Sequence, residues 1–499
     1  MSQLRSVQTL IGSLSKAEKR HFKLYSKRIN RSDEKRYLTL YHIIEANLNI
    51  SDTMLKKKVS NTPLGKHLHF YKKNLFDMIM EGLLDIYRSE ELLGTLRYTI
   101  RESELLMERC MYAEAEKRLI KIRKIAWHYE YFNEFIEIGC ILTKLKQAYQ
   151  KSKADVHQLL KENQHAIDLL SALNAIQECR IALWNQIRKL GNYSNKAEIA
   201  HIPLRLEADI VKKATKKSLL CYYYMLGIHA TIQSFVYGNA KRAQHYELKQ
   251  IQLFQKKAGF FKIHIDEYIK AVANYFQSTV YSGNLDVSQR TLREFRSTIG
   301  NNSASYNPHV GRKIEVVLLN MDVTILWYHG DYQSIVTFES QIRNVCTQEH
   351  YPIDINKKHH LWLVLAIAFL YVGNFEKAIE VVRDGFNEKE AARYLETYFD
   401  VLLLKWVVFY SKGEESLTKS AHQAMTYLVS RKAPHQVVFK QLLKSINFKP
   451  ASSKRKGKSE TMAKALASCK FLESGRAHTR IFRILQFLQD KVVASQKGK

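Results

Sequence analysis

The residues that could perform catalysis do not fall into a known catalytic or metal-binding spacing in this sequence. His359-His360 and the pair His67 and His69 lack the four-residue separation that places two imidazoles on one helix face, so we expect solvated histidines. The segment Gly457-Lys458-Ser459 has the ending of a phosphate-binding P-loop, but Ser452 stands where that loop requires glycine. No H-E-x-x-H, G-x-S-x-G or G-x-G-x-x-G sequence occurs. We therefore expect no enzyme, with no cofactor, no metal and no small-molecule substrate.

The six cysteines indicate neither a zinc site nor a disulfide framework, because none form a C-x-x-C pair and all lie tens of residues apart. We expect them to be small buried residues in a reducing compartment. Residues 1–20 show no apolar segment followed by a cleavage site. The longest apolar run, Leu361–Val372, is about half of the roughly 20 residues that a membrane-spanning helix needs. These features predict a cytoplasmic protein without a membrane segment. The cysteines are Cys110, Cys140, Cys179, Cys221, Cys346 and Cys469.

The formal net charge of +30 is the compositional outlier, and it indicates a polyanionic or acidic partner, since so large a positive field repels itself. Both ends are richest in positive charge: residues 428–499 hold 17 Lys and Arg against three acids, and residues 1–88 hold 17 against eight. For any single group of lysines, a solvated face that maintains solubility is the alternative interpretation. The candidate binding residues are Lys16, Arg20, Lys23, Lys27, Lys56, Lys57, Lys58, Lys454, Arg455, Lys456 and Lys458.

A short phrase recurs along the chain and predicts the elements that would position such groups. It consists of an apolar or aromatic residue followed closely by glycine, in most copies with Asn or Asp next, and its glycines are 47, 45, 47, 43 and 40 residues apart. Glycine after an apolar helical stretch takes the left-handed conformation that ends a helix, and Asn or Asp then caps the next one. Each phrase therefore predicts a tight turn between two helices. The glycines are Gly191, Gly238, Gly283, Gly330, Gly373 and Gly413.

The segment from Trp362 to Gly385 resembles the tetratricopeptide repeat (TPR) family. Trp362, Leu365, Ala366 and Phe369, followed by Gly373-Asn374-Phe375 and Ala378, are similar to that family's W-x2-L-G-x2-Y and G-[DN]-[YF]-x2-A pattern. The resemblance implies an all-α, right-handed solenoid of helix hairpins whose period here is about 40–47 residues. Elsewhere the sequence departs from the family: Trp184 and Trp406 stand where a small residue is expected, and no unit ends in proline. We expect Trp184, Trp362 and Trp406 to be buried between helices.

We expect four regions: a basic helical region over 1–92, a TPR-like array over 93–448, a basic linker over 449–459 and short C-terminal helices over 460–499. In the first region, Ser15 and Glu18 form a capping box that starts a helix running to about Ile29. Further helices are expected after Ser32, after Ser51, and from about Gly65 to Arg88. This opening is similar to that of uncharacterised bacterial helical-repeat proteins, a likeness that implies no function.

A helical array without active-site motifs favours a non-enzymatic scaffold that binds a protein partner, plausibly an acidic one. The alternative is an RNA-, DNA- or ribosome-associated protein that uses its basic ends as the binding regions. A lesser alternative is a repeat regulator with an N-terminal helix-turn-helix over Ser51–Val59 and the helix after Gly65. Apolar residues on two faces of that second helix argue against its lying in a DNA groove.

Overall fold

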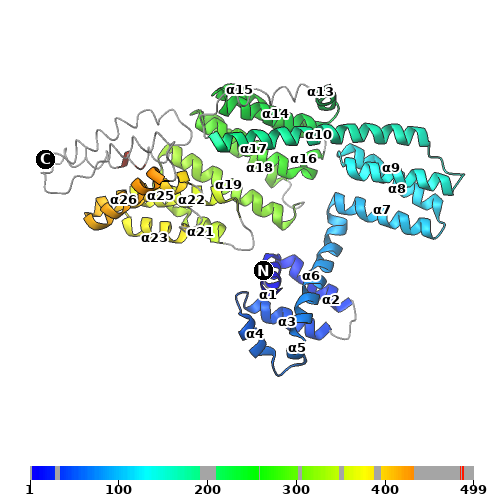
Figure 1. Ribbon diagram of the computed structural model, residues 1–499, viewed down its shortest axis with the longest axis horizontal. Coiled ribbons are helices and arrows are strands. Elements are labelled where there is room, and N and C mark those ends of the chain that lie inside the picture. Colours follow the sequence, from blue (N-terminus) through cyan, green and yellow to red (C-terminus); the bar gives the residue numbers. More distant parts are fainter. Residues whose placement is uncertain are drawn as a thin grey trace. The chain divides into compact units, whose positions relative to one another are not determined.

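The computed structural model is entirely helical over the residues it describes, which are 3–28, 34–190, 209–257, 259–301, 306–347, 353–386, 395–431, 484, 486 and 487. No strand occurs among them, as expected for the all-α class. The helices, labelled as in Figure 1, are α1 Gln3–Ser13, α2 Lys16–Arg28, α3 Glu34–Ala46, α4 Asp52–Val59, α5 Pro63–Lys66, α6 Leu68–Glu90, α7 Leu92–Glu108, α8 Tyr112–His128, α9 Phe132–Ala148, α10 Val156–Leu190, α13 Asp209–Thr215, α14 Leu219–Phe235, α15 Ala240–Lys256, α16 Phe260–Ile263, α17 Ile265–Tyr281, α18 Leu285–Gly300, α19 Pro308–His329, α20 Tyr332–Thr337, α21 Glu339–Thr347, α22 Ile355–Tyr371, α23 Phe375–Gly385, α25 Leu395–Lys412 and α26 Glu415–Arg431.

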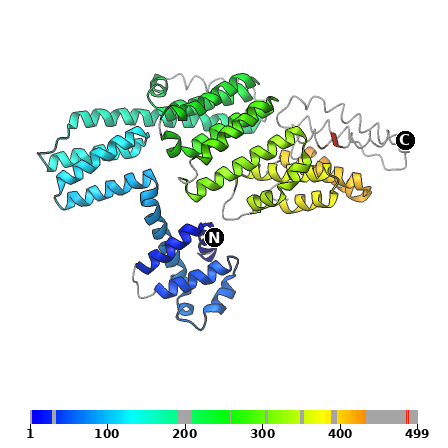
Figure 2. The same cartoon turned by 180° about the vertical axis from the view of Figure 1, so that it is seen from behind.

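The described helices fall into two compact units whose boundary lies between Tyr275 and Phe276, inside α17. Within unit 1, α7, α8 and α9 lie side by side as antiparallel rods, and the long α10 runs beside α9 (Figures 1 and 2). The helix α6 ends at Glu90 and α7 begins at Leu92, close to the expected break at residue 92. The unit boundary falls inside the range 93–448 that the sequence assigns to one array. Among the described residues, no helix combines the length and apolar character needed to cross a bilayer.

Five of the six repeat glycines lie between consecutive helices and have a positive φ; the sixth, Gly191, lies outside the described residues. At four of these turns the residue after glycine donates its N–H to the carbonyl five positions earlier, as Asn374 does to Phe369 at 2.9 Å. This bond satisfies a carbonyl that the helix end leaves unpaired. Asn374 then accepts from the Lys377 N–H at 3.1 Å and caps α23, and Asn239 and Asp331 cap the next helices in the same way. The φ values are 64° at Gly238, 77° at Gly283, 72° at Gly330, 84° at Gly373 and 79° at Gly413.

The basic N-terminal region contains the expected helices with small shifts in their ends. The Ser15 N–H donates to Glu18 at 2.6 Å while the Glu18 N–H donates to Ser15 Oγ at 3.2 Å, which is the predicted capping box. Ser51 caps α4 by accepting from the Met54 N–H. The helix expected from Gly65 is instead two, α5 and α6, separated at His67.

A buried glutamate joins the turn between α8 and α9 to the start of α14. Glu130 has a left-handed backbone, with φ 60°, and its carboxylate accepts hydrogen bonds from Ser218 Oγ at 2.8 Å and from the N–H groups of Leu219 at 2.7 Å and Leu220 at 3.0 Å. Since the first amides of a helix have no partner inside the helix, this carboxylate satisfies them from 88 or more residues away in sequence. A negative charge there also complements the helix dipole.

The same turn is held by His264, whose Nε2 lies 2.9 Å from the Tyr129 carbonyl. Burial lowers the pKa of His264 below its usual 6.5, against the opposing effects of that hydrogen bond and of Glu267 and Glu130, while Lys257 lowers the pKa further. The folded state therefore favours the neutral ring. This contribution to stability is complete above about pH 6.5, where the unfolded histidine is also neutral, and is lost as the pH falls through that value.

We expect His264→Gln, which keeps an N–H donor for Tyr129 but does not titrate, to flatten the acid side of the stability profile. From pH 7.5 to pH 5 the thermal midpoint of the wild type should fall further than that of the variant. His229 and His422, whose pKa values are also lowered by burial, titrate equally in both proteins and cancel in the comparison. His245→Gln, at an exposed position in α15, is the matched control and should follow the wild type. Identical profiles for wild type and His264→Gln would contradict this assignment.

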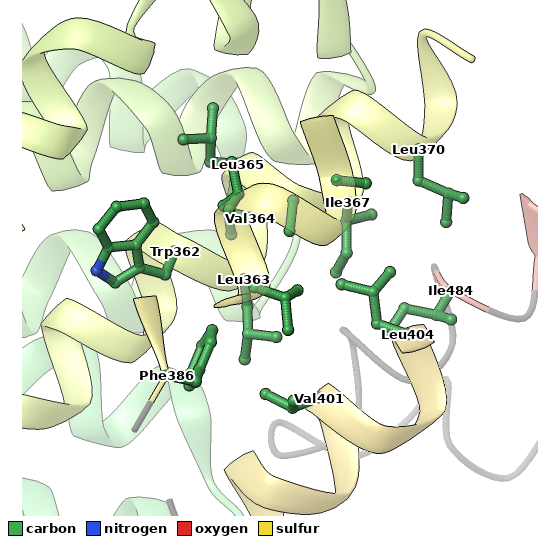
Figure 3. Close-up of a cluster of buried hydrophobic side chains, with 14 of the residues drawn as sticks. Trp362, Leu363, Val364, Leu365, Ile367, Leu370, Phe386, Val401, Leu404 and Ile484 are labelled. Atoms are coloured by element: carbon green, nitrogen blue, oxygen red, sulfur yellow. The ribbon is translucent and has the colours of Figure 1, made fainter. Parts of the chain in front are cut away.

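The core of unit 2 is built around α22, in which every residue from Leu361 to Leu370 is buried (Figure 3). Trp362 is fully buried there, and Ile484 packs against Leu404 from near the end of the chain. Phe487 also contacts this core, with its ring 5.2 Å from that of Tyr371. The linker expected over 449–459 and most of the helices expected over 460–499 lie outside the described residues.

Three expectations about burial are wrong. Trp184 is 39% exposed, because it lies edge-on against Phe235 at the surface of α10, whereas Trp362 and Trp406 are buried as predicted. Cys110 and Cys140 are exposed; Cys110 occupies a turn at the end of α7, where no helix covers it. His359 is buried because its ring packs against Phe386.

Candidate functional site

The structure brings four of the predicted cationic residues together on one face of α2. Lys16, Arg20, Lys23 and Lys27 surround a shallow depression of about 450 Å³, as their three- and four-residue spacing predicts. Three further residues line the depression, one cationic, one apolar and one acidic, and the sequence pattern singled out none of them: Lys19, Leu24 and Glu45.

Glu45 is the single carboxylate that lines this depression, and it forms ion pairs with two lysines. It lies 3.4 Å from Lys19 Nζ and 3.2 Å from Lys23 Nζ. Burial opposes ionisation of Glu45, but the hydrogen bond and charge of Lys23, with the charge of Lys19, outweigh it and lower the pKa of this carboxyl. Lys16, Arg20 and Lys27 are exposed and have no acidic partner among the residues that the structure describes. The face therefore keeps a net positive charge.

The second predicted group, Lys56, Lys57 and Lys58, is exposed on α4 and does not join the first. Figure 1 places α4 and α2 on opposite sides of α3. Consecutive residues on a helix point in different directions, so these three charges do not share one face. The third group, Lys454, Arg455, Lys456 and Lys458, lies outside the described residues.

A larger concave surface with apolar walls lies elsewhere in unit 1, between α8, α9 and α10. This groove has a volume of about 840 Å³. Phe135, Leu142 and Leu159 form its buried floor, and Trp127 and Ile120 remain 37% and 38% exposed at its edge. The Trp127 ring lies 4.9 Å from Phe135, measured between ring centroids, so the exposed indole is fixed in position from below. Exposed aromatic and aliphatic side chains that line a groove are typical of a binding site.

A buried polar network supports the floor of this groove. Arg123, only 8% exposed, lies over the Phe135 ring at 3.9 Å and donates to Asn163 Oδ1 at 2.9 Å and to Glu162. Burial alone would raise the pKa of Glu162, but the hydrogen bonds from Arg123 and Gln158 lower it. Asn163 fits because the neighbouring position in α9 is Gly139, where a Cβ atom would stand 2.2 Å from Asn163 Oδ1. The network therefore fixes the relative positions of α8, α9 and α10.

The lining of the groove carries a net positive charge because its cations outnumber its acids, and both acids are already engaged. Glu162 pairs with Arg123, and Asp155 accepts from the Gln158 N–H at the start of α10. Lys124, Lys161 and Lys217 line the groove, are exposed and have no acidic partner within the described part of the chain. The arrangement can receive an apolar side chain on the floor and carboxylates at the rim.

One histidine lines the groove between α8, α9 and α10. This residue, His165, lies beside Trp127, with the two rings tilted by 46° and their centroids 5.7 Å apart. Over the described ranges, no three His, Cys, Asp or Glu side chains gather as metal ligands would. The sequence does not reveal the groove, because its lining comes from four separate segments. The one local signal is the four-residue spacing of Arg123 and Trp127, which places both on one face of α8. No protein-family model matches this chain, and no curated protein matches it.

Proposed function

We propose that this protein is a non-enzymatic scaffold that binds an acidic segment of a partner protein in the groove between α8, α9 and α10. The observation that carries the proposal is the combination of an exposed Trp127 over an apolar floor with three rim lysines that have no acidic partner among the described residues. Aromatic residues held in a groove dominate binding energy, and complementary charge at the rim sets partner choice and association rate. The bound segment would contain Asp or Glu around one aromatic or aliphatic anchor.

The wider architecture that we propose is a TPR-like, right-handed solenoid of helix hairpins, in which the groove is one part of an extended concave surface. The recurrent left-handed turns support it, since each reverses the chain between neighbouring helices. Pairing of helices adjacent in sequence, such as α14 with α15 and α22 with α23, also supports it.

Binding should be measured with short fluorescent peptides of Asp and Glu around a central Phe or Leu, by fluorescence anisotropy. Trp127→Ala is expected to weaken binding about 30-fold, the effect of losing roughly 2 kcal/mol at a central aromatic contact. Lys124→Glu combined with Lys161→Glu should weaken binding roughly tenfold by reversing the rim charge. Peptides with Asn and Gln in place of the acids should bind weakly to the wild type.

The matched control for the rim is Lys121→Glu combined with Lys144→Glu, which changes the net charge equally at exposed positions of α8 and α9 outside the groove. It should bind within about twofold of the wild type, since screening weakens distant surface charges. Equal losses in the two double variants, or unchanged binding by Trp127→Ala with its helical content intact, would rule out the groove as the site.

A further inference from the structure

One face of α2 carries more positive charge than the surrounding protein neutralises. Lys16, Arg20, Lys23 and Lys27 form a stripe that spans about 16 Å along the helix, at 1.5 Å per residue. Glu45 is shared between Lys19 and Lys23, and the remaining three cations of the stripe have no acidic partner in the residues described. A polyanion placed along this stripe would meet several cations at once.

Two other acidic groups near α2 are engaged by partners outside this stripe. Glu18 accepts from the Ser15 N–H and from the Tyr87 hydroxyl at 2.5 Å, and Asp85 lies 3.1 Å from His21 Nε2. These bonds, with the buried Phe22 against Tyr41, fix α2 on α6 and α3. The stripe is therefore a preorganised surface, and binding would not require α2 to be ordered first.

The chemistry of the stripe favours phosphates of a double helix over other polyanions. Lysine is a point charge that contacts phosphate without reading bases, and such contacts position a duplex without sequence preference. Single strands need exposed rings on which bases stack, but Phe22 is 2% exposed and the other rings of α2, His21 and Tyr25, are partly covered. Leu24 is the one large apolar side chain exposed on α2, which is too little for an amphipathic helix that inserts into lipid.

We propose that this face of α2 binds the phosphate backbone of double-helical nucleic acid without reading its sequence. Along one strand of a duplex, phosphates recur about every 3.4 Å of axis, so a stripe of this length spans about five of them. The inference goes beyond the peptide groove and does not depend on it. It assigns to the N-terminal helices a second binding activity with its own residues.

The test compares two triple variants of the full chain that remove the same number of charges. The α2 variant replaces Lys16, Arg20 and Lys27 by Gln. The α4 variant replaces Lys56, Lys57 and Lys58 by Gln. All six are exposed residues of unit 1, and Gln preserves helix propensity. Binding to labelled duplex DNA and duplex RNA of scrambled sequence is measured by anisotropy from about 50 to about 200 mM salt.

We expect wild-type binding to weaken steeply with salt, and the α2 variant to bind at least tenfold more weakly at the lowest salt. The slope of log affinity against log salt should be smaller by about three in the α2 variant, one for each lost phosphate contact. The α4 variant should keep a slope within about one of the wild type. Trp127→Ala should bind duplexes normally, which separates this site from the groove.

Several outcomes would overturn the proposal. Equal losses in the two triple variants would show that net charge alone attracts the duplex. Tighter binding to a single strand of the same length would indicate a stacking surface instead. Stronger binding to polyglutamate or to vesicles of anionic lipid than to duplex would assign the face to an acidic protein or a membrane. Absence of duplex binding at the lowest salt would exclude the site.

Discussion

Replacing Glu130 with alanine is expected to lower the free energy of unfolding of unit 1 by about 4 kcal/mol, because three donors at the start of α14 lose their acceptor together. The Leu220 N–H and the Ser218 hydroxyl are buried, so water cannot replace the carboxylate without opening the packing. A buried donor left unsatisfied costs about 1 to 3 kcal/mol, and hydrogen bonds to a charged acceptor are stronger than neutral ones.

Two further substitutions of Glu130 separate the contribution of its hydrogen bonds from that of its left-handed backbone. Glu130→Gln keeps one carbonyl acceptor and should cost roughly half as much as the alanine change. Glu130→Gly loses the same hydrogen bonds as alanine but tolerates the left-handed φ, so it should be about 1 kcal/mol less destabilised than Glu130→Ala. Hydrogen exchange at the first amides of α14 and chemical denaturation both report the effect. A Glu130→Ala protein within about 0.5 kcal/mol of the wild type, with α14 still protected, would refute the role of this carboxylate.

Glu130 also shows why the sequence predicts some turns and misses others. The glycine phrases predict the turns after α17, α19, α22 and α25, where a left-handed residue is needed and glycine takes that conformation without strain. Cys110 and Glu130 have φ values of 58° and 60° and the same hydrogen bond from the following residue, Met111 to Leu106 and Tyr131 to Ala126. A search for glycine cannot find these two turns.

The sequence predicts the basic face of α2 but not the groove, because the first lies on one helix and the second is assembled from several. Lys16, Arg20, Lys23 and Lys27 lie on one helix, so the helical period alone groups them. Lys19 lies three residues after Lys16 and four before Lys23, so the same period places it beside them. Its ion pair with Glu45, from another helix, is what the helical period does not show. The groove needs residues of α8, α9 and α10 and Lys217, and no local pattern relates these segments. Trp184 was wrongly placed because helical spacing cannot tell which faces of α10 its neighbours cover.

Gly385→Ala, at the end of α23, is expected to destabilise unit 2 by about 2 to 3 kcal/mol through overpacking. A Cβ atom there would stand 2.5 Å from Trp362 Cγ and Cδ2, closer than real Cβ contacts allow. Trp362 is fully buried in the core of Figure 3, with Arg343 over its ring, so the indole cannot rotate away without displacing its neighbours. Only glycine lets α23 approach α22 this closely.

Gly311→Ala in the first turn of α19 is the matched control, because it adds the same atom to the same unit where nothing lies within 4 Å of the new Cβ. This change should raise stability by about 0.5 to 1 kcal/mol, since alanine loses less backbone entropy in a helix than glycine does. The two glycine-to-alanine changes should therefore shift the free energy of unfolding in opposite directions. The difference between them measures the contact with Trp362 separately from helix propensity. Thermal unfolding and hydrogen exchange of the α22 amides should show lower stability for Gly385→Ala and higher stability for Gly311→Ala. A stabilised Gly385→Ala protein would mean that α22 and α23 have room between them, which would contradict the close approach of Gly385 to Trp362.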